Sequence, residues 1–360
     1  MTVAIRLILL LLLLAVLPTS PARAAGFGPP IRVTPDGCSV ARFLTDSRGV
    51  VRGAATCSDG RVSVLTRSGA SWQRAVTTWR GTVLAVADDG SALFVLSAKD
   101  GTLFVARRTH GDKTYPQRVV GQHNAVQAAM VARNGHWHAV WRTYVPPGDV
   151  PDHLWQGGTL FPGGARQITF DAHTDVAPQL AFGPAGQLVL AWERFTSPSS
   201  VRFATATEGT WRSRQLSPRG VAATGAALVA GRDGSAVAWI EGPHRQLRLT
   251  RLPSGGGTTT ALWSRGDVSE IAMSGPATAP LLFLREGAGA ATRHLYVRRL
   301  ANGFGSEDVT VPADEYAEDI NALAVGGSAQ HPVLLYMDQR QSGPDPQYAQ
   351  DASAVLSRTR

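Results

Sequence analysis

The 360-residue sequence lacks most of the features that announce a catalytic or membrane function. It has only two cysteines, and its only lysines are Lys99 and Lys113. Beyond the N-terminal segment, no apolar run is long enough to cross a bilayer. There is no Gly-x-Ser-x-Gly elbow, phosphate-binding loop or Asp-rich calcium loop. These absences exclude a further helical membrane span and the best-marked hydrolase and nucleotide sites, and we expect neither a cofactor nor a metal ion.

The single long apolar run has the pattern of an export signal. Arg6 precedes the apolar run Leu7–Leu17, and Ala22-Arg23-Ala24 matches the small-x-small rule for cleavage. We therefore expect residues 1–24 to be a signal peptide and residues 25–360 to form one secreted domain. An uncleaved anchor is the alternative, but the apolar run is short for a membrane span.

The positive charge is spread along the chain. The formal net charge is +8, and loss of Arg6 and Arg23 lowers it to +6. Such a charge can attract nucleic acid or acidic glycans. The arginines are dispersed, however, which favours codon usage as their cause. Because a nucleic-acid partner is also difficult to reconcile with export, we expect none.

The two cysteines are placed to form a disulfide. Cys38 precedes a predicted strand at Val40–Leu44, and Cys57 follows a predicted strand at Val50–Thr56. In an antiparallel hairpin these two ends are neighbours, and an oxidising compartment favours the bond. Closing this loop would stabilise the fold by roughly 3 kcal/mol. Free thiols or a metal pair are the alternatives, although two cysteines with no nearby histidine make a poor metal site.

A strand–turn–strand unit at Pro178–Arg194 recurs along the chain. Two apolar runs, Leu180–Phe182 and Leu188–Trp192, flank the turn Gly183-Pro184-Ala185-Gly186. Equivalent turns follow at intervals of roughly 40 to 50 residues, the period of propeller blades. The turns are marked by Gly49, Gly90, Gly135, Gly186, Gly234, Thr278 and Ser328.

Two further β-prone runs follow most hairpins, for example Gln246–Leu252 and Thr259–Trp263. Four strands in each of seven units predict an all-β propeller with seven four-stranded blades. The last unit, which ends with Ala354–Arg358, lacks a fourth strand, and Ile31–Thr34 can supply it and close the ring. A six-bladed ring with an irregular N-terminal unit is the alternative.

Two segments rich in Pro, Gly and Asp interrupt the repeat. They are Val145–Gly158 and Arg340–Gln350, and both follow the second strand of a unit. Both are therefore expected on the same face of the disk, either as functional loops or as tolerated insertions.

Polar residues are predicted to converge on the same face, at the mouth of the central channel. The first strand of each blade starts there and the second strand returns there. Such a mouth is the default ligand site of a ring. The predicted ligand-binding residues are Arg142, Tyr144, Asp175, Glu193, Arg194, Glu241, Glu270, Arg285 and Asp338.

Aromatic and histidine positions give two further expectations. Trp141, Trp192 and Trp239 occupy equivalent places near the ends of second strands, which predicts packing between blades. His136 and His138 share one face of a strand. With no third ligand evident nearby, we interpret them as a surface pair away from the mouth.

Two turns carry an aromatic residue after a glycine. Thr205–Trp211 reads TATEGTW, and Ser68–Trp72 reads SGASW. These turns resemble the Ser-x-Asp-x-Gly-x-x-Trp motif of secreted bacterial propellers of the sialidase-like (Asp-box) superfamily, with Glu208 in place of Asp. In that family the motif lies between the third and fourth strands of a blade.

The resemblance also implies which residues a sialidase activity would require in this sequence. That family uses an arginine cluster, a Tyr-Glu pair and an Asp acid, and its Arg-Ile-Pro motif has only a poor match at Ile31–Pro35. Arg142, Arg194 and Arg285 could imitate the arginine cluster, and Tyr144 with Glu193 or Glu241 could imitate the nucleophile and base.

We therefore interpret the protein as a monomeric, secreted, non-catalytic binding propeller. Its expected ligand is an extracellular glycan or another exported protein. The alternative is a sialidase-like glycoside hydrolase or a lyase that uses the carboxylates and arginines of the mouth.

Overall fold

The computed structural model describes most of the chain, and every regular element in that part is a strand. The described residues are 31–32, 38–45, 51–68, 71–89, 91–109, 118–122, 124–144, 151–159, 164–207, 209–252, 258–263, 268–286, 294–299, 305–309, 319–327, 332–339 and 352–357. The predicted signal peptide and the segment Arg340–Gln350 lie outside them. No helix in the described part is long and apolar enough to cross a membrane. The prediction of an all-β fold is confirmed.

The strands form seven four-stranded antiparallel sheets. The first two sheets are β2 (Cys38–Thr45), β3 (Val51–Cys57), β4 (Arg61–Ser68) and β5 (Ser71–Arg80), then β6 (Thr82–Asp88), β7 (Ser91–Ser97), β8 (Thr102–Thr109) and β9 (Arg118–Gln122). The third and fourth are β10 (Ala125–Arg133), β11 (His136–Thr143), β12 (Leu154–Gly158) and β13 (Arg166–Gln167), then β14 (Thr174–Phe182), β15 (Leu188–Phe195), β16 (Ser200–Thr207) and β17 (Thr210–Gln215).

The remaining three sheets repeat this order. They are β18 (Ala223–Gly231), β19 (Gly234–Glu241), β20 (Gln246–Leu252) and β21 (Thr258–Trp263); β22 (Val268–Ser274), β23 (Leu281–Glu286), β24 (His294–Arg299) and β25 (Gly305–Val309); and β26 (Asp319–Gly327), β27 (Pro332–Gln339), β28 (Ala352–Ser357) and β1 (Ile31–Arg32). In the last sheet, Ile31 of β1 lies opposite Val355 of β28.

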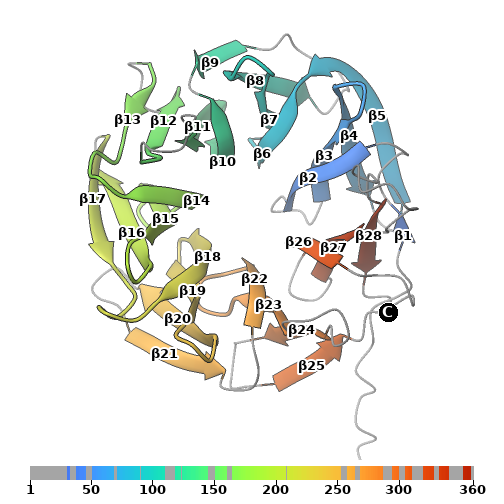
Figure 1. Ribbon diagram of the computed structural model, residues 1–360. Coiled ribbons are helices and arrows are strands. Elements are labelled where there is room, and N and C mark those ends of the chain that lie inside the picture. The colour runs from blue at the N-terminus through green and yellow to red at the C-terminus, as the bar shows by residue number, and fades with distance from the viewer. Residues whose placement is uncertain are drawn as a thin grey trace, which may run out of the picture.

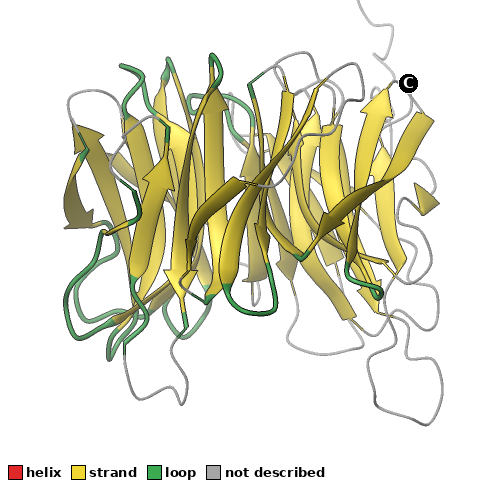
Figure 2. Ribbon diagram, turned by 90° about the horizontal axis from the view of Figure 1, so that it is seen from above, coloured by secondary structure: helices red, strands yellow, loops and turns green. Residues whose placement is uncertain are grey.

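The sheets stand side by side around a common centre, with the first strand of each sheet innermost (Figure 1). Each innermost strand contacts the next one along the chain, and β2 also contacts β26. Seen from the side, the strands run between the two faces of a flat disk (Figure 2).

The core lies between neighbouring sheets. One buried cluster joins Leu84 and Val95 of the second sheet to Met130 and Trp141 of the third. Trp141, Trp192 and Trp239 are 0%, 1% and 0% exposed, which confirms their predicted packing role. Truncating one of these indole rings to alanine would cost about 3 to 5 kcal/mol.

The interpretation of Val145–Gly158 as a single insertion is wrong at its end. Leu154–Gly158 forms β12, the third strand of its sheet, although two glycines end it. A Cβ atom on Gly157 would come within 3.1 Å of the Trp141 ring, so the glycine allows the close approach that this tryptophan needs. The beginning of the insertion lies outside the described residues.

The predicted disulfide is confirmed. Cys38 and Cys57 lie directly opposite each other in the β2–β3 register, and their sulfur atoms are bonded. The bond ties the start of the first hairpin to its end, across a sequence separation of 19 residues.

Each innermost strand has an irregular register close to its start. The shifts fall between Val40/Arg42, Val83/Ala85, Ala125/Gln127, Val176/Gln179, Thr224/Ala227, Val268/Glu270 and Asn321/Ala324. Two of these bulges contain a residue with positive φ, Ala177 at 51° and Gly225 at 68°. A bulge leaves backbone groups unpaired within its own sheet, and these groups then need partners from elsewhere.

Candidate functional site

The starts of the first strands and the ends of the second strands lie at the same edge of the sheets, here called the mouth edge. The register places Ala125 opposite Thr143, Asp175 opposite Arg194, and Ala223 opposite Glu241. All predicted ligand-binding residues are at or near this edge, so their exposure and partners decide what each can do.

Among the described residues of this edge, Asp175 and Arg194 form the most buried ion pair. Asp175 is 0% exposed and accepts hydrogen bonds from Arg194 Nε at 2.8 Å and Arg194 Nη2 at 3.0 Å. The indole Nε1 of Trp192 donates to the same carboxylate at 2.7 Å. Arg194 also pairs with Asp171, whose side chain is half exposed. Asp175 and Arg194, both predicted to bind a ligand, therefore bind other residues of the protein instead.

Glu193 reaches across to the next sheet. Its Oε1 accepts hydrogen bonds from the backbone N–H groups of Gly225 at 2.6 Å and Ala226 at 3.3 Å, within the bulge of β18. Burial raises the pKa of the Glu193 carboxyl, and the two backbone hydrogen bonds oppose that shift. Glu193 thus supplies the acceptor that the bulge lacks.

Arg142 is held by a residue that sequence reasoning missed. Its Nε and Nη2 donate to Asp152 Oδ2 at 2.9 and 2.5 Å. Arg142 Nη1 also lies 3.5 Å from Oε1 of Gln127, the oxygen that accepts the backbone N–H of Ala177 at 2.9 Å. Asp152 lies in a Pro- and Asp-rich stretch, and nothing in that stretch identifies Arg142 as its partner.

The other predicted residues divide into paired and exposed groups. Glu241 accepts hydrogen bonds from Trp239 Nε1 at 3.1 Å and Arg248 Nε at 3.0 Å. The side chain of Tyr144 is 40% exposed.

Three predicted residues lie on the later sheets. Glu270 is half buried on β22, and Arg285 of β23 lies opposite it in the register. Asp338 of β27 lies opposite Ile320 of β26. These positions belong to the sixth and seventh sheets, at the same edge as the predicted residues of the third to fifth sheets.

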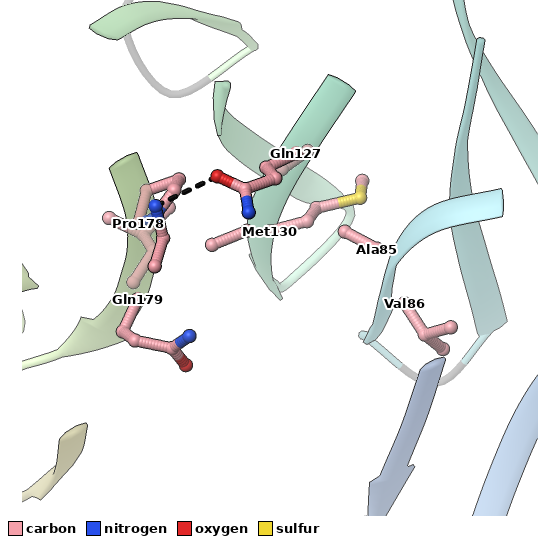
Figure 3. Close-up of a pocket in the computed structure, with 10 residues that line it drawn as sticks. Ala85, Val86, Gln127, Met130, Pro178 and Gln179 are labelled. Atoms are coloured by element: carbon pink, nitrogen blue, oxygen red, sulfur yellow. Dashed lines mark hydrogen bonds between the residues drawn. The ribbon is translucent and has the colours of Figure 1, made fainter. Parts of the chain in front are cut away.

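A cavity of about 200 Å³ lies between three innermost strands (Figure 3). Its walls begin at the third or fourth residue of each strand, so it lies close to the mouth edge. The lining comes from Ala85, Val86, Gln127, Ala128, Ala129, Met130, Ala177, Pro178, Gln179 and Leu180. None of these side chains is ionisable. We call this space the axial cavity.

Two glutamines are the only polar side chains among these lining residues, and sequence reasoning had singled out neither. The side-chain amide oxygen of Gln127 accepts the backbone N–H of Ala177, and a dashed line marks this hydrogen bond in Figure 3. Gln179 is exposed, and its amide has no hydrogen-bond partner among the described residues. An amide offers both donors and an acceptor, so Gln179 can bind a polar, uncharged group.

The interpretation of His136 and His138 as a surface pair is wrong for His138. His136 is exposed, but His138 is 0% exposed, and its Nε2 lies 3.1 Å from Gln156 Oε1. Trp211 Nε1, from the turn that resembles the Asp-box motif, donates to the same oxygen at 2.9 Å. Burial, with a smaller effect of Arg166, lowers the pKa of His138 from 6.5 to about 4. The fourth sheet is therefore linked to His138 through Gln156.

In the part of the chain that the structure describes, no group of three or more His, Cys, Asp or Glu side chains is placed to hold a metal ion.

Comparison with known proteins shows the fold and does not show a family. No protein-family model and no curated protein matches the chain. Among solved structures, it is similar to an oligogalacturonate lyase in complex with manganese (TM-score 0.63, 13% identity, covering 92% of this chain and 96% of that one). It is also similar to YCF48 bound to D1 peptide (0.56, 13%, 93% and 96%) and to the BP39L lectin from Burkholderia pseudomallei (0.55, 15%, 80% and 90%). These neighbours are β-propellers, and the likeness shows that fold for this chain.

Proposed function

We propose that the protein is an exported, non-catalytic binding propeller that receives its ligand in the axial cavity from the mouth edge. In this proposal the seven sheets are the blades of a ring closed by β1 on β28, and residues 1–24 are the signal peptide. The disulfide supports export, because such bonds persist in oxidising compartments. The observation that carries the proposal is a contrast within the described residues. The cavity is neutral and its Gln179 amide has no hydrogen-bond partner there, whereas five charged side chains described at the mouth edge have partners within the protein; these are Arg142, Asp175, Glu193, Arg194 and Glu241.

The state of the carboxylates favours binding over hydrolysis or elimination. A glycosidase needs two carboxyl groups that flank the scissile bond and are free to exchange protons with it. Asp175 and Glu241 each accept hydrogen bonds from a tryptophan and an arginine, and Glu193 accepts two from backbone N–H groups. Using any of them as an acid or base would break these contacts, which lie within one sheet for Asp175 and Glu241 and between two sheets for Glu193.

The size of the cavity indicates how a ligand would sit. At about 200 Å³ it is smaller than the roughly 300 to 1,000 Å³ of sites that enclose a drug-sized molecule. It can hold one small ring or one side chain of a larger ligand. The rest of the ligand would then lie on the mouth edge.

The experiment compares ligand capture by the wild-type protein and by Gln179→Ala. Residues 25–360 are screened against an array of neutral and acidic glycans and a library of short peptides. Gln179 is exposed and has no described partner, so its truncation should leave the fold intact, as circular dichroism would check. The matched control is Gln73→Ala, an exposed glutamine on the outermost strand β5.

Binding that is lost in Gln179→Ala and kept in Gln73→Ala supports the proposal. Equal binding by both variants, or no binding to any array member, overturns the axial cavity as the site. Release of new reducing or unsaturated ends from a bound glycan contradicts a non-catalytic role.

A further inference from the structure

We infer that the fourth sheet carries a second binding site, in which Arg202 and Arg194 bind a carboxylate group of a ligand in place of Asp171. We call it the arginine site. It goes beyond the proposed function, because its two arginines lie on β16 and β15 and the site shares no residue with the lining of the axial cavity.

The register of the fourth sheet places the two arginines on one face. Arg202 of β16 lies opposite Trp192 of β15, and Arg194 of β15 lies opposite Asp175 of β14. Residues directly opposite each other, and residues two positions apart along a strand, project from the same face of a sheet. These four side chains therefore share a face. Because Trp192 belongs to one buried cluster with Leu154, this face is turned toward the third sheet.

The two guanidinium groups are close to each other and to two carboxylates. Arg202 and Arg194 are diagonal neighbours on adjacent strands, a spacing of about 7 to 8 Å that long side chains can span. The pKa of Arg202 is lowered, mainly by burial and then by the charge of Arg194, while Asp175 and Asp171 act in the opposite direction. Arg202 therefore lies within reach of all three charges.

Arg202 nevertheless lacks an acceptor of its own. The residue is half buried, and its Nε is buried with no hydrogen-bond partner in the part of the chain that the structure describes. The salt bridges that Asp171 and Asp175 form there both go to Arg194. A buried donor without an acceptor is unfavourable, so an acceptor supplied by a ligand would be stabilising.

The fifth sheet shows which acceptor is missing. Arg248 of β20 lies opposite a buried tryptophan, Trp239, as Arg202 does in the fourth sheet. Two residues after that tryptophan comes Glu241, whose Oε1 accepts Arg248 Nε at 3.0 Å. In the fourth sheet the same position holds Arg194, which can only donate. The fourth sheet thus has a second cation where the fifth sheet has the acceptor.

Asp171 balances this second positive charge from outside the sheet. Two guanidinium groups and the buried Asp175 leave one positive charge, and Asp171 pairs with Nη1 of Arg194. The side chain of Asp171 is 45% exposed, whereas that of Asp175 is 0% exposed. An ion pair with an exposed partner contributes little to stability. A ligand can therefore displace Asp171 into water while Arg194 keeps its buried partner.

The charge and shape of the arginine site favour a carboxylate. A carboxylate already occupies Nη1 of Arg194, and the planar fork of a guanidinium group matches a carboxylate in two parallel hydrogen bonds. One carboxylate neutralises the single positive charge. A phosphate monoester carries about −1.5 to −2 at pH 7 and would add excess negative charge beside Asp175. The site should therefore prefer carboxylates to phosphates.

The test follows the Nε–H signal of Arg202 by NMR while small probes are added to the ¹⁵N-labelled protein. Glucuronate and N-acetylglycine carry the carboxylate on a sugar and on an amino acid, and glucose and N-acetylglycinamide are their uncharged counterparts. Glucose 6-phosphate is the phosphate probe. The variants are Arg202→Gln and Asp171→Asn. The matched control is Arg214→Gln, because Arg214 is exposed on the neighbouring strand β17 and lies opposite Phe203, on the other face.

We expect the Arg202 signal to shift and saturate with a carboxylate and to stay unchanged with both uncharged probes. Arg202→Gln should weaken binding at least about tenfold, because it removes hydrogen bonds from a charged donor. Asp171→Asn should strengthen binding about two- to fivefold, because it removes the competing carboxylate. Arg214→Gln should bind as the wild type does. The Asp171→Asn variant keeps the inference testable if Arg202→Gln does not fold.

A response to glucuronate alone, or to N-acetylglycine alone, supports the arginine site and identifies a sugar or a peptide as the source of the carboxylate. No response to either probe, equal affinity for the phosphate, or weaker binding by Asp171→Asn would overturn the inference. Binding that is lost in Gln179→Ala would also overturn it, since the carboxylate would then lie in the axial cavity. Failure of the arginine site leaves the proposed function intact, because that function is tested through Gln179.

Discussion

Acidification should destabilise the protein through one buried histidine. His138 is fully buried in a contact with Gln156, and burial lowers its pKa to about 4. The amide oxygen of Gln156 can only accept, so His138 carries its proton on Nε2 when neutral. Adding a second proton would place a charge on a fully buried side chain, which burial disfavours.

The direction and size of the effect follow from linkage. In the unfolded chain His138 titrates near 6.5, so between pH 6.5 and 4 the unfolded state binds more protons than the folded state. Stability is therefore lost as the pH falls through this window. With these two pKa values, His138 accounts for a loss of about 2.5 kcal/mol between pH 7 and pH 4.5.

The assay is urea unfolding at both pH values for the wild type and two variants. His138→Gln should be less stable at pH 7 but should lose about 2.5 kcal/mol less than the wild type on acidification. His136→Gln, which changes the exposed histidine two residues away, should behave as the wild type. NMR titration of the folded wild type offers a second readout, since His138 should stay neutral at pH 5.

Equal losses in the wild type and His138→Gln, or a charged His138 at pH 5, would refute this reasoning.

Three further predictions concern the joints between strands and sheets. Asp175→Ala should cost about 3 to 5 kcal/mol in urea unfolding, because it leaves Arg194 without its buried partner, whereas Asp171→Ala should cost less than about 1 kcal/mol; equal costs would argue against the assignment. Replacing both cysteines by alanine should lower the unfolding free energy by roughly 3 kcal/mol, and an unchanged urea midpoint would contradict this. Glu193→Gln keeps the acceptor for the β18 bulge and removes a charge that burial disfavours. Because the raised pKa makes the wild type lose stability as the pH rises, the variant should be at least as stable at pH 7 and lack that dependence; a destabilised variant would show that the charge is needed.

The hairpins were predictable because their signals are local. Glycine turns between short apolar runs give the positions of strands such as β20, whose observed bounds match the prediction. The Cys38–Cys57 bond was predictable for the same reason, since both residues belong to one hairpin.

What sequence reasoning could not supply depends on contacts between sheets. The oxygen of Gln156 that contacts His138 also accepts a hydrogen bond from Trp211 of the next sheet, 55 residues beyond Gln156. The backbone N–H of Gly225 can donate a hydrogen bond to Glu193 only because the β18 bulge turns its N–H groups toward the preceding sheet. Polar residues at strand ends look alike in sequence, whether they face a ligand or a neighbouring bulge. The axial cavity could not be predicted from the sequence either, because no ionisable residue lines it and four of its ten lining residues are alanine.

The bulges on the innermost strands limit how this molecule can be rearranged. Gln127 of the third sheet satisfies the bulge of the fourth, and Glu193 of the fourth satisfies that of the fifth. A single sheet transplanted into another position of the ring would leave behind the acceptor for its own bulge and carry an acceptor for a different one. The segment that keeps its own contact is therefore β15–β18 at the joint between the fourth and fifth sheets, because Glu193 lies on β15. At the joint between the third and fourth sheets it is β10–β14, because Gln127 lies on β10. Repeat-shuffling experiments should cut the chain within sheets.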